Sequence, residues 1–335
     1  MEYRILGKTG LKVSRMGLGG IPIQRISIEE AKVLVHQLME EGVNFVDTAK
    51  AYSVSEEYLG YALEGIRDKF VLASKSTDRT REGMARDIED SLAKLRTDYI
   101  DLYQVHNPSP AQLEQVLAPG GALEALLEAK AAGKIGHIGL TCHSLKIFEK
   151  ALELPWVETI MFPYNVVEIH GKEMIAAAKK KNIGFIDMKP LAGGAIENAE
   201  LAVRFVSADP NVDVIIPGMA NEEEMRMNLA AVEQGGPFTE EEIAFMEQLC
   251  LDMGTQFCRR CNYCAPCTVG INISNAFIFH GYLTRYDLEG WARERYDAMG
   301  APAGACIGCG ACEPRCPYEL PIREMLRQVA ADFGK

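Results

Sequence analysis

Short apolar segments alternate with amphipathic segments along the first two thirds of the chain. The apolar segments have the length of β-strands and are rich in branched and aromatic residues. They are Arg15–Gly19, Asn44–Thr48, Phe70–Lys75, Leu102–Val105, His137–Thr141, Thr159–Pro163, Gly184–Lys189 and Val214–Pro217. Between them the apolar positions recur with a helical period, in Ile28–Glu41, Ser55–Leu63, Arg81–Leu95, Leu123–Ala132, Leu145–Leu152, Gly171–Lys181, Glu197–Ser207 and Glu222–Glu233.

This alternation predicts an α/β fold with parallel strands, for which two architectures compete. Eight strand–helix units fit a closed (β/α)8 TIM barrel. An open doubly wound sheet also alternates strands and helices, but no G-x-G-x-x-G follows any predicted strand. The barrel is therefore favoured. A β-hairpin over residues 1–15 precedes it, and Thr239–Cys250 adds a helix that opens with a Thr-x-x-Glu capping box.

Cysteine is the residue type that divides the chain. Of ten cysteines, eight lie between Cys258 and Cys316. We therefore expect a barrel domain over residues 1–252 and a small, mostly helical domain over 253–335. Because no export signal precedes the barrel pattern, metal ligation explains this cysteine density better than a secreted disulfide framework does.

Charge and hydropathy limit the partners that we expect. The formal net charge of −12 disfavours binding to nucleic acid. Met1–Lys8 lacks the apolar run of a signal peptide, and no stretch approaches the ~18 apolar residues that a membrane span needs. The sequence predicts a cytoplasmic protein without a membrane partner.

The spacing of the clustered cysteines is typical of iron–sulfur proteins. Cys258, Cys261, Cys264 and Cys267 form C-x2-C-x2-C-x2-C, and Cys306, Cys309, Cys312 and Cys316 form C-x2-C-x2-C-x3-C before Pro317. The second spacing is the bacterial ferredoxin pattern, in which the fourth cysteine reaches the other cluster. We predict two [4Fe–4S] clusters with crossed ligation, one on Cys258, Cys261, Cys264 and Cys316, the other on Cys306, Cys309, Cys312 and Cys267. Zinc prefers two separated C-x2-C pairs in each site and fits less well.

The segment between the two cysteine runs contains two helical patterns, over Ile273–Arg285 and Asp287–Ala298. The arrangement resembles the helical ferredoxin module found beside fumarate reductase flavoproteins. The first run departs from the ferredoxin pattern because one residue fewer precedes Cys267 and Thr268 replaces proline.

Polar residues stand at the carboxyl ends of three consecutive predicted strands, where TIM barrels carry their chemistry. Asp47, Lys75 and His106 end strands two to four, and Tyr52 follows in the loop after the second strand. The segment from Asp47 to Tyr52, followed by Ser55-Glu56, resembles the signature of the aldo-keto reductase family, and the likeness extends to about residue 250. The resemblance implies an active site of Asp47, Tyr52, Lys75 and His106, and a subgroup fused to a ferredoxin-like module.

The chemistry of these four side chains supports a reductase. A phenol with a pKa near ~10 is a weak acid at neutral pH. Lys75 would stabilise the phenolate of Tyr52, and Asp47 would anchor the ammonium group. Tyr52 could then protonate a carbonyl oxygen that His106 orients while a hydride reaches the carbon.

The resemblance also implies a nicotinamide site, from which this chain departs. Ile216-Pro217-Gly218-Met219 and Asn228 are similar to the family's cofactor loop and helix, with Gly218 at the phosphate. Many members that use NADP carry Arg where this chain has Glu224, which favours NADH over NADPH. Met161 and Met188 replace a glutamine and an aromatic residue. Thr141 and Asn165 are candidates for polar contacts.

Three functions follow from these features. The first is an NAD(P)H-dependent reduction of a small-molecule carbonyl (an aldehyde or ketone), with clusters that are structural, regulatory or a docking point for a redox partner such as ferredoxin. The second is an electron-transfer enzyme that links the ferredoxin-type clusters to a bound cofactor or substrate, either with or without the help of a flavin. The third is an accessory subunit that senses redox or nucleotide state.

Overall fold

A computed structural model describes residues 1–235, 237–254 and 256–335. The strands are β1 (Tyr3–Ile5), β2 (Lys12–Ser14), β3 (Leu18–Gly19), β4 (Phe45–Asp47), β5 (Val71–Ser76), β6 (Ile100–His106), β7 (Ile135–Thr141), β8 (Thr159–Pro163), β9 (Gly184–Met188) and β10 (Val214–Ile216). β1 and β2 form an antiparallel hairpin, and β3 to β10 form one parallel sheet in chain order.

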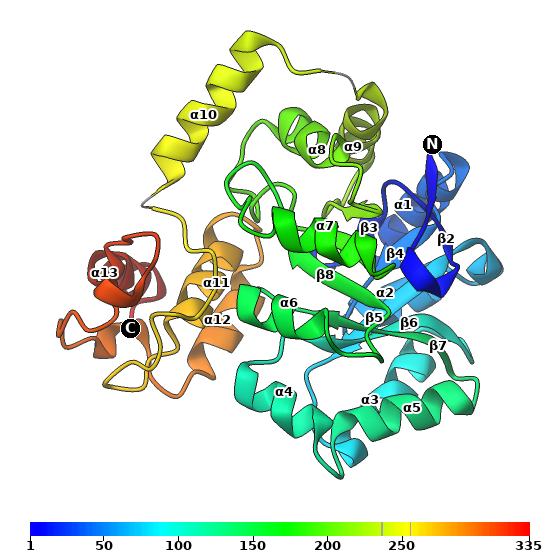
Figure 1. The fold of residues 1–335 in the computed structure, drawn as a ribbon, viewed down its shortest axis with the longest axis horizontal. Helices are drawn as coiled ribbons and strands as arrows, with labels where there is room; N and C mark the ends of the chain where they lie inside the picture. The colour runs from blue at the N-terminus through cyan, green and yellow to red at the C-terminus, as the bar shows by residue number, and fades with distance from the viewer. Residues whose placement is uncertain (236, 255) are drawn as a thin grey trace. The chain divides into compact units, whose positions relative to one another are not determined.

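The parallel sheet closes on itself. Parallel bridges join Met16 to Ile215 and Gly19 to Gly218, so the first and last strands of the sheet meet. Helices follow the strands and surround them (Figure 1). They are α1 (Ile28–Glu40), α2 (Ser55–Ala62), α3 (Arg81–Lys94), α4 (Pro110–Leu117), α5 (Ala122–Ala131), α6 (Leu145–Ala151), α7 (Lys172–Lys180), α8 (Ala199–Ser207) and α9 (Glu222–Gln234). The (β/α)8 TIM barrel predicted from the sequence is confirmed.

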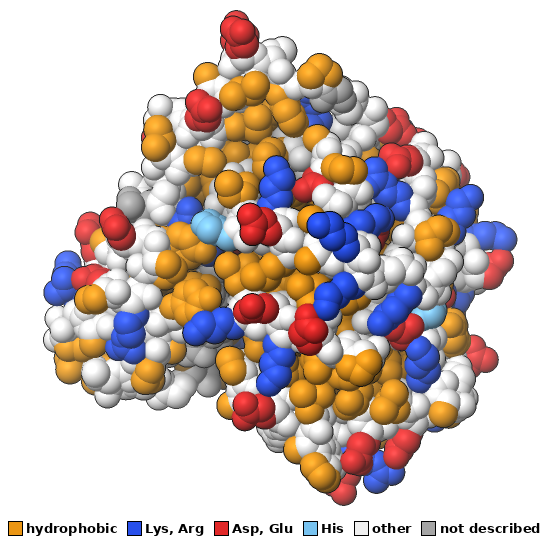
Figure 2. All heavy atoms as spheres, in the orientation of Figure 1, with side chains coloured by type: hydrophobic (Ala, Val, Ile, Leu, Met, Phe, Trp, Pro, Cys, Tyr) orange, Lys and Arg blue, Asp and Glu red, His pale blue; other side chains and the backbone are white. Residues whose placement is uncertain are grey.

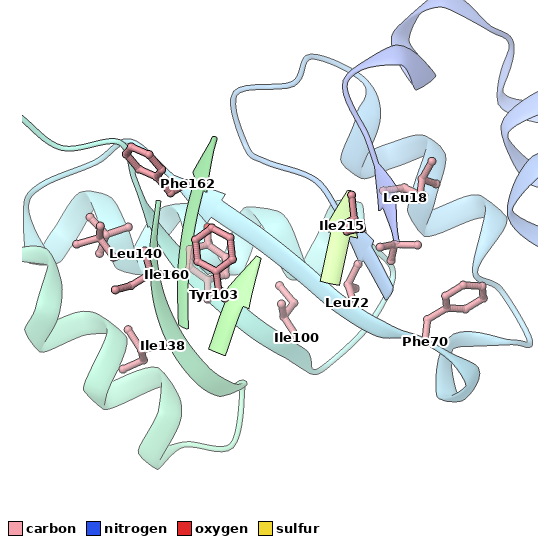
Figure 3. Close-up of a cluster of buried hydrophobic side chains, with 14 of the residues drawn as sticks. Leu18, Phe70, Leu72, Ile100, Tyr103, Ile138, Leu140, Ile160, Phe162 and Ile215 are labelled. Atoms are coloured by element: carbon pink, nitrogen blue, oxygen red, sulfur yellow. The ribbon is translucent and has the colours of Figure 1, made fainter. Parts of the chain in front are cut away.

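Two apolar cores flank the strands, because successive residues of a strand point to opposite faces. The outward-facing residues pack between sheet and helices, as Leu72, Tyr103 and Ile160 do in Figure 3. The inward-facing residues fill the barrel. They are Phe45, Val71, Ala73, Leu102, Met161, Ile186, Val214 and Ile216. A residue two or four positions farther along the same strand therefore also faces the interior of the barrel.

The N-terminal hairpin covers one end of the barrel interior. Leu6 and Val13 belong to the inner core, and the amide of Lys8 donates to the carbonyl of Asn182 at 2.7 Å. Gly7 lies at φ +51°, and a Cβ there would come within 2.1 Å of the Gly184 nitrogen. Only glycine fits this close approach to the start of β9.

Helix α4 was not expected from the apolar pattern. Its N-terminus is a capping box in which Ser109 accepts from the Gln112 amide and Gln112 accepts from the Ser109 amide. Ser-Pro-x-Gln is a recognisable helix start, but the helix has only two buried residues, Leu113 and Val116. A helical period is hard to see in so short an apolar face.

Contacts along the chain define two compact units, Met1–Asn165 with Ile169–Leu191 and Ile196–Gly236, and Val166–Glu168 with Ala192–Ala195 and Pro237–Lys335. The second unit contains α10 (Glu240–Gly254), α11 (Ile273–Thr284), α12 (Glu289–Asp297) and α13 (Ile322–Phe333). Tyr296 stacks on Phe333 at 3.9 Å between ring centroids in its core. The domain boundary at residues 252 and 253 stays a prediction.

The surface carries both signs of charge. On the face drawn in Figure 2, Lys and Arg side chains are interspersed with Asp and Glu. Of the helices within the described residues, none has the length and apolar character needed to cross a membrane.

Candidate active site and cysteine cavities

Strand alternation brings three of the four predicted active-site residues to the same inner face. Asp47 lies two residues after Phe45, Lys75 two after Ala73, and His106 four after Leu102. Their strands β4, β5 and β6 are neighbours in the parallel sheet. The carboxyl ends of these strands therefore converge inside one rim of the barrel.

A buried ion pair joins Asp47 and Lys75. The Lys75 Nζ lies 2.5 Å from Asp47 Oδ2 and also donates to the carbonyl of Thr48 at 2.7 Å. Both side chains are almost fully buried, at 3% and 1% exposure. Burial raises the pKa of Asp47 and lowers the pKa of Lys75, while the attraction within the pair opposes both shifts. A charged pair in this position needs its remaining hydrogen bonds satisfied.

Gln104 supplies one of these hydrogen bonds and was not predicted. Its Nε2 donates to Asp47 Oδ1 at 3.3 Å, and the side chain is fully buried in β6. A polar residue within Leu102–Val105, two positions before His106, faces the same side of the strand. That spacing could have identified Gln104 as part of the site.

The rings of Tyr52 and His106 lie beside the charged pair. The Lys75 Nζ is 4.8 Å from the centroid of the Tyr52 ring. The two rings meet edge to face, with centroids 6.0 Å apart and an interplanar angle of 86°. Tyr52 and His106 are half-buried, whereas the charged pair beside them is fully buried. The four predicted side chains thus form one cluster that grades from a buried charge to accessible rings.

Backbone and carboxylate contacts hold the loops around this cluster. Arg79 Nη2 donates to the carbonyl of His106 at 2.7 Å. Glu56, in α2 directly after the Tyr52 loop, is 1% exposed and accepts from the Ser74 hydroxyl at 2.6 Å. Ser55 donates to the carbonyl of Gly20 at 2.9 Å. The Ser-Glu pair of the sequence signature therefore attaches α2 to its neighbouring segments.

Three of the predicted nucleotide contacts lie at or just after the ends of β7, β8 and β9. Thr141 Oγ1 accepts from the amide of Asn107 at 3.0 Å at the end of β7. Asn165 is fully buried and donates from Nδ2 to the carbonyl of Lys189 at 3.0 Å. Met188 ends β9 and is half-buried. Met161 is buried in the inner core.

Glu224 turns back on the N-terminus of its own helix, α9. Its Oε2 accepts from the amide of Ala220 at 2.6 Å, and its Oε1 lies 3.5 Å from Arg25 Nη2. A third of the side chain is exposed, so it is less open to solvent than a free member of an acidic run. The Ala220 amide and the Arg25 guanidinium group could attract a phosphate here, but both already interact with the Glu224 carboxylate.

Gly218 and Asn228 lie near this helix start. Gly218 is exposed. A Cβ at this position would come within 2.6 Å of Pro22, so there is no room for a side chain here. Asn228 is 2% exposed, and its Oδ1 has no hydrogen-bond partner in the described part of the chain. A buried amide oxygen without a donor is unfavourable unless a ligand supplies one.

The eight clustered cysteines line two cavities in the second unit. One, of about 300 Å³ including its open mouth, is lined by Cys258, Cys261, Cys264 and Cys316. The other, of about 320 Å³, is lined by Cys267, Cys306, Cys309 and Cys312. Ile273 borders both. We call them the first and the second cysteine cavity.

Thiolate sulfur is the ligand type of [4Fe–4S] clusters, so four cysteines around each cavity suit such a group. No set of three or more His, Cys, Asp or Glu side chains within residues 1–235, 237–254 and 256–335 is arranged to hold a single metal ion.

The two cavities differ in their surroundings. Burial raises the pKa of Cys258 to about 12 and that of Cys264 to about 11 in the first cavity. In the second cavity Cys309 is exposed, and a hydrogen bond with Thr268, 3.2 Å between Oγ1 and Sγ, lowers its pKa.

Comparison with known proteins identifies the class. Residues 15–200 match the aldo/keto reductase family, and residues 257–321 match the 4Fe-4S dicluster domain. The chain belongs to the aldo/keto reductase family and carries a 4Fe-4S dicluster domain after the barrel, as the sequence predicted.

Individual relatives cover the barrel. The chain is 33% identical over 205 residues to the aldo-keto reductase YhdN of Bacillus subtilis (strain 168), which covers 54% of this chain and 59% of YhdN. It is 25% identical over 283 residues to L-galactose dehydrogenase of Arabidopsis thaliana, over 69% of this chain and 88% of that protein. The fold is similar to that of aldo-keto reductase AKR11C1 from Bacillus halodurans, with a TM-score of 0.65, 24% identity, and coverage of 74% and 96%.

Proposed function

We propose that this protein reduces the carbonyl group of a small aldehyde or ketone with NAD(P)H. The observation that carries the proposal is the buried Lys75–Asp47 pair, whose Nζ lies 4.8 Å from the Tyr52 ring centroid. Bound NAD(P)H supplies the hydride that reaches the carbonyl carbon. The residues of the barrel supply the proton, its stabilisation and the orientation of the carbonyl.

Tyr52 is the proton donor in this proposal. The Tyr52 hydroxyl passes its proton to the carbonyl oxygen as the C–H bond forms, which leaves an alcohol and a phenolate. The ammonium group of Lys75 stabilises that phenolate, and Asp47 keeps the ammonium charged despite its burial. His106, edge to face with Tyr52, orients the carbonyl oxygen. Solvent then returns a proton to Tyr52, which is half-buried.

Replacement of Tyr52 by Phe tests this role. Carbonyl-dependent NAD(P)H oxidation should fall by about 100-fold or more, since a positioned acid contributes about that much to the rate. Nucleotide affinity, measured by fluorescence titration, should stay unchanged. Tyr61→Phe removes a hydroxyl from α2, the helix that follows the Tyr52 loop, where Tyr61 donates to Glu29, and serves as the control with full activity.

If Tyr52→Phe kept the wild-type rate on every aldehyde and ketone turned over, the reductase proposal would be wrong. Nucleotide binding without turnover by the wild-type holoprotein would favour an accessory, sensing role.

NADH is the proposed cofactor in preference to NADPH. Glu224 supports this choice because its carboxylate occupies the Ala220 amide and lies beside Arg25. A 2′-phosphate would meet a negative charge where it needs donors. Asn228 supports a dinucleotide in general, since its buried Oδ1 suits a donor such as the adenine amino group.

Replacement of Glu224 by Gln should therefore improve NADPH affinity by about tenfold while NADH affinity changes little, because one like-charge contact of about 1 kcal/mol or more is removed. Fluorescence titration with both nucleotides measures this. Glu223→Gln makes the same charge change on an exposed neighbour and should alter neither affinity. An equal change for both nucleotides in Glu224→Gln would contradict the assignment.

The second unit is proposed to hold two [4Fe–4S] clusters with crossed ligation. The cysteines that line each cavity support this pairing, because Cys316 lines the first cavity and Cys267 the second. An electron-transfer function is the second candidate, and these cavities favour it. In that case the clusters exchange single electrons with a redox protein such as ferredoxin.

Two double variants test the crossed ligation by iron and sulfide content after anaerobic reconstitution. Cys264→Ser with Cys316→Ser removes two ligands of one cluster and should leave the other intact. Cys264→Ser with Cys267→Ser removes one ligand from each cluster and should weaken both. The reverse pattern would show that each cysteine run binds its own cluster.

A further inference from the structure

A buried serine lines the first cysteine cavity. Ser274 is the second residue of α11 and is 2% exposed. Its Oγ is buried and forms no hydrogen bond to any residue that the structure describes. A buried hydroxyl that gives up water without gaining a partner is unfavourable for folding, so this position calls for a ligand with acceptor atoms.

The common structural uses of a serine near a helix start do not apply to Ser274. The N-cap of α11 is Asn272, whose side chain accepts from the Asn275 amide at 3.1 Å. A serine within a helix often donates to the carbonyl four residues earlier, which here is that of Gly270, but Ser274 makes no such bond. The Ser274 hydroxyl therefore neither caps the helix nor donates a hydrogen bond to its backbone.

The surroundings of Ser274 within the cavity leave sulfur as its natural partner. The lining residues Ile273, Phe277 and Ile322 have apolar side chains without an acceptor, and the polar residues Asn262 and Tyr318 of the same lining form no hydrogen bond with Ser274. The cysteines of this cavity already receive one donor, since the amide of Arg260 donates to Cys258 Sγ at 3.4 Å. Sulfide and thiolate sulfurs of a cluster are acceptors that carry negative charge.

We propose that the Ser274 hydroxyl donates a hydrogen bond to a sulfur of the cluster in the first cysteine cavity and raises that cluster's reduction potential. The proposal rests on the cluster assignment made above. Reduction adds an electron whose charge is spread over the sulfurs, so a donor stabilises the reduced form more than the oxidised form. In this proposal Ser274 acts on the reduction potential through its hydrogen bond to sulfur and does not ligate iron.

The second cavity provides a matched comparison. There Thr268 Oγ1 lies 3.2 Å from Cys309 Sγ, and this hydrogen bond is exposed, whereas Ser274 is buried. Solvent water can replace the hydroxyl of Thr268, because Cys309 is itself exposed. Ser274 is buried at 2% exposure, so solvent water cannot replace its hydroxyl, and the effect of its removal should be the larger of the two.

Redox titration of the reconstituted, full-length holoprotein, followed by EPR, tests the proposal. In Ser274→Ala one of the two one-electron steps should move to lower potential by about tenfold in its equilibrium constant, which corresponds to about 59 mV. Ser274→Thr and Ser274→Val have the same shape and differ only in the hydroxyl. Thr should keep the wild-type potential, and Val should show the shift. Thr268→Val should leave the potential of the Ser274-dependent step unchanged.

A second readout reports the proton directly. Pulsed EPR of the reduced protein in H2O and in D2O should show an exchangeable hydrogen coupled to one cluster in addition to that of the Arg260 amide, and this additional coupling should be missing in Ser274→Val and present in Ser274→Thr. Loss of packing alone would not produce that difference.

The outcomes separate this proposal from the cluster assignment. Wild-type protein that binds the iron of fewer than two four-iron clusters would overturn the assignment itself. Full cluster content with unchanged potentials in Ser274→Ala, or with equal shifts in the Thr and Val variants, would overturn the role of Ser274 alone. Failure of Val, but not of Thr, to load the first cavity would support a hydroxyl bond to the cluster.

Discussion

The buried ion pair of Lys75 and Asp47 is the constraint on which the barrel site depends. The interior of the barrel is otherwise filled by apolar side chains such as Phe45 and Leu102, and an unpaired charge there would be strongly unfavourable. The pair is tolerated because Gln104 and the carbonyl of Thr48 complete its hydrogen bonds. Ionisable groups whose pKa values are shifted by burial and by a charged partner are typical of catalytic sites, and here they lie beside the half-buried phenol of Tyr52.

The barrel could be predicted from the sequence because its signals are local. Strand β8 was predicted at its observed bounds, Thr159–Pro163, since a short apolar run between polar segments reports burial on both faces. Strand alternation then carried Asp47, Lys75 and His106 to one side. Gln104 was missed because it lies within its strand and not at the strand end, although its spacing from His106 places it on the same face. Helix α4 was missed because its apolar face is too short to show a period. Helix α13, which follows the last cysteine, was not predicted either.

The two halves handle electrons differently. A nicotinamide transfers a hydride, which is an electron pair, whereas a four-iron cluster exchanges one electron at a time. The side chains of the barrel are suited to the first process, and the cysteine cavities to the second. Ser274 and Thr268 show that the cavities differ in burial and in donors, so two bound clusters would differ in potential. The carbonyl reduction proposed for the barrel needs no electron from them.

Direct hydride transfer is the central claim, and isotope transfer from the cofactor tests it most directly. The holoprotein is incubated anaerobically with nicotinamide cofactor deuterated at the transferring position and with a carbonyl substrate that it turns over, in ordinary water. We predict that the deuterium is found on the carbinol carbon of the alcohol product, because the hydride passes straight to the carbonyl. An alcohol whose new C–H hydrogen comes from the solvent would contradict the account and would indicate that electrons travel separately from protons.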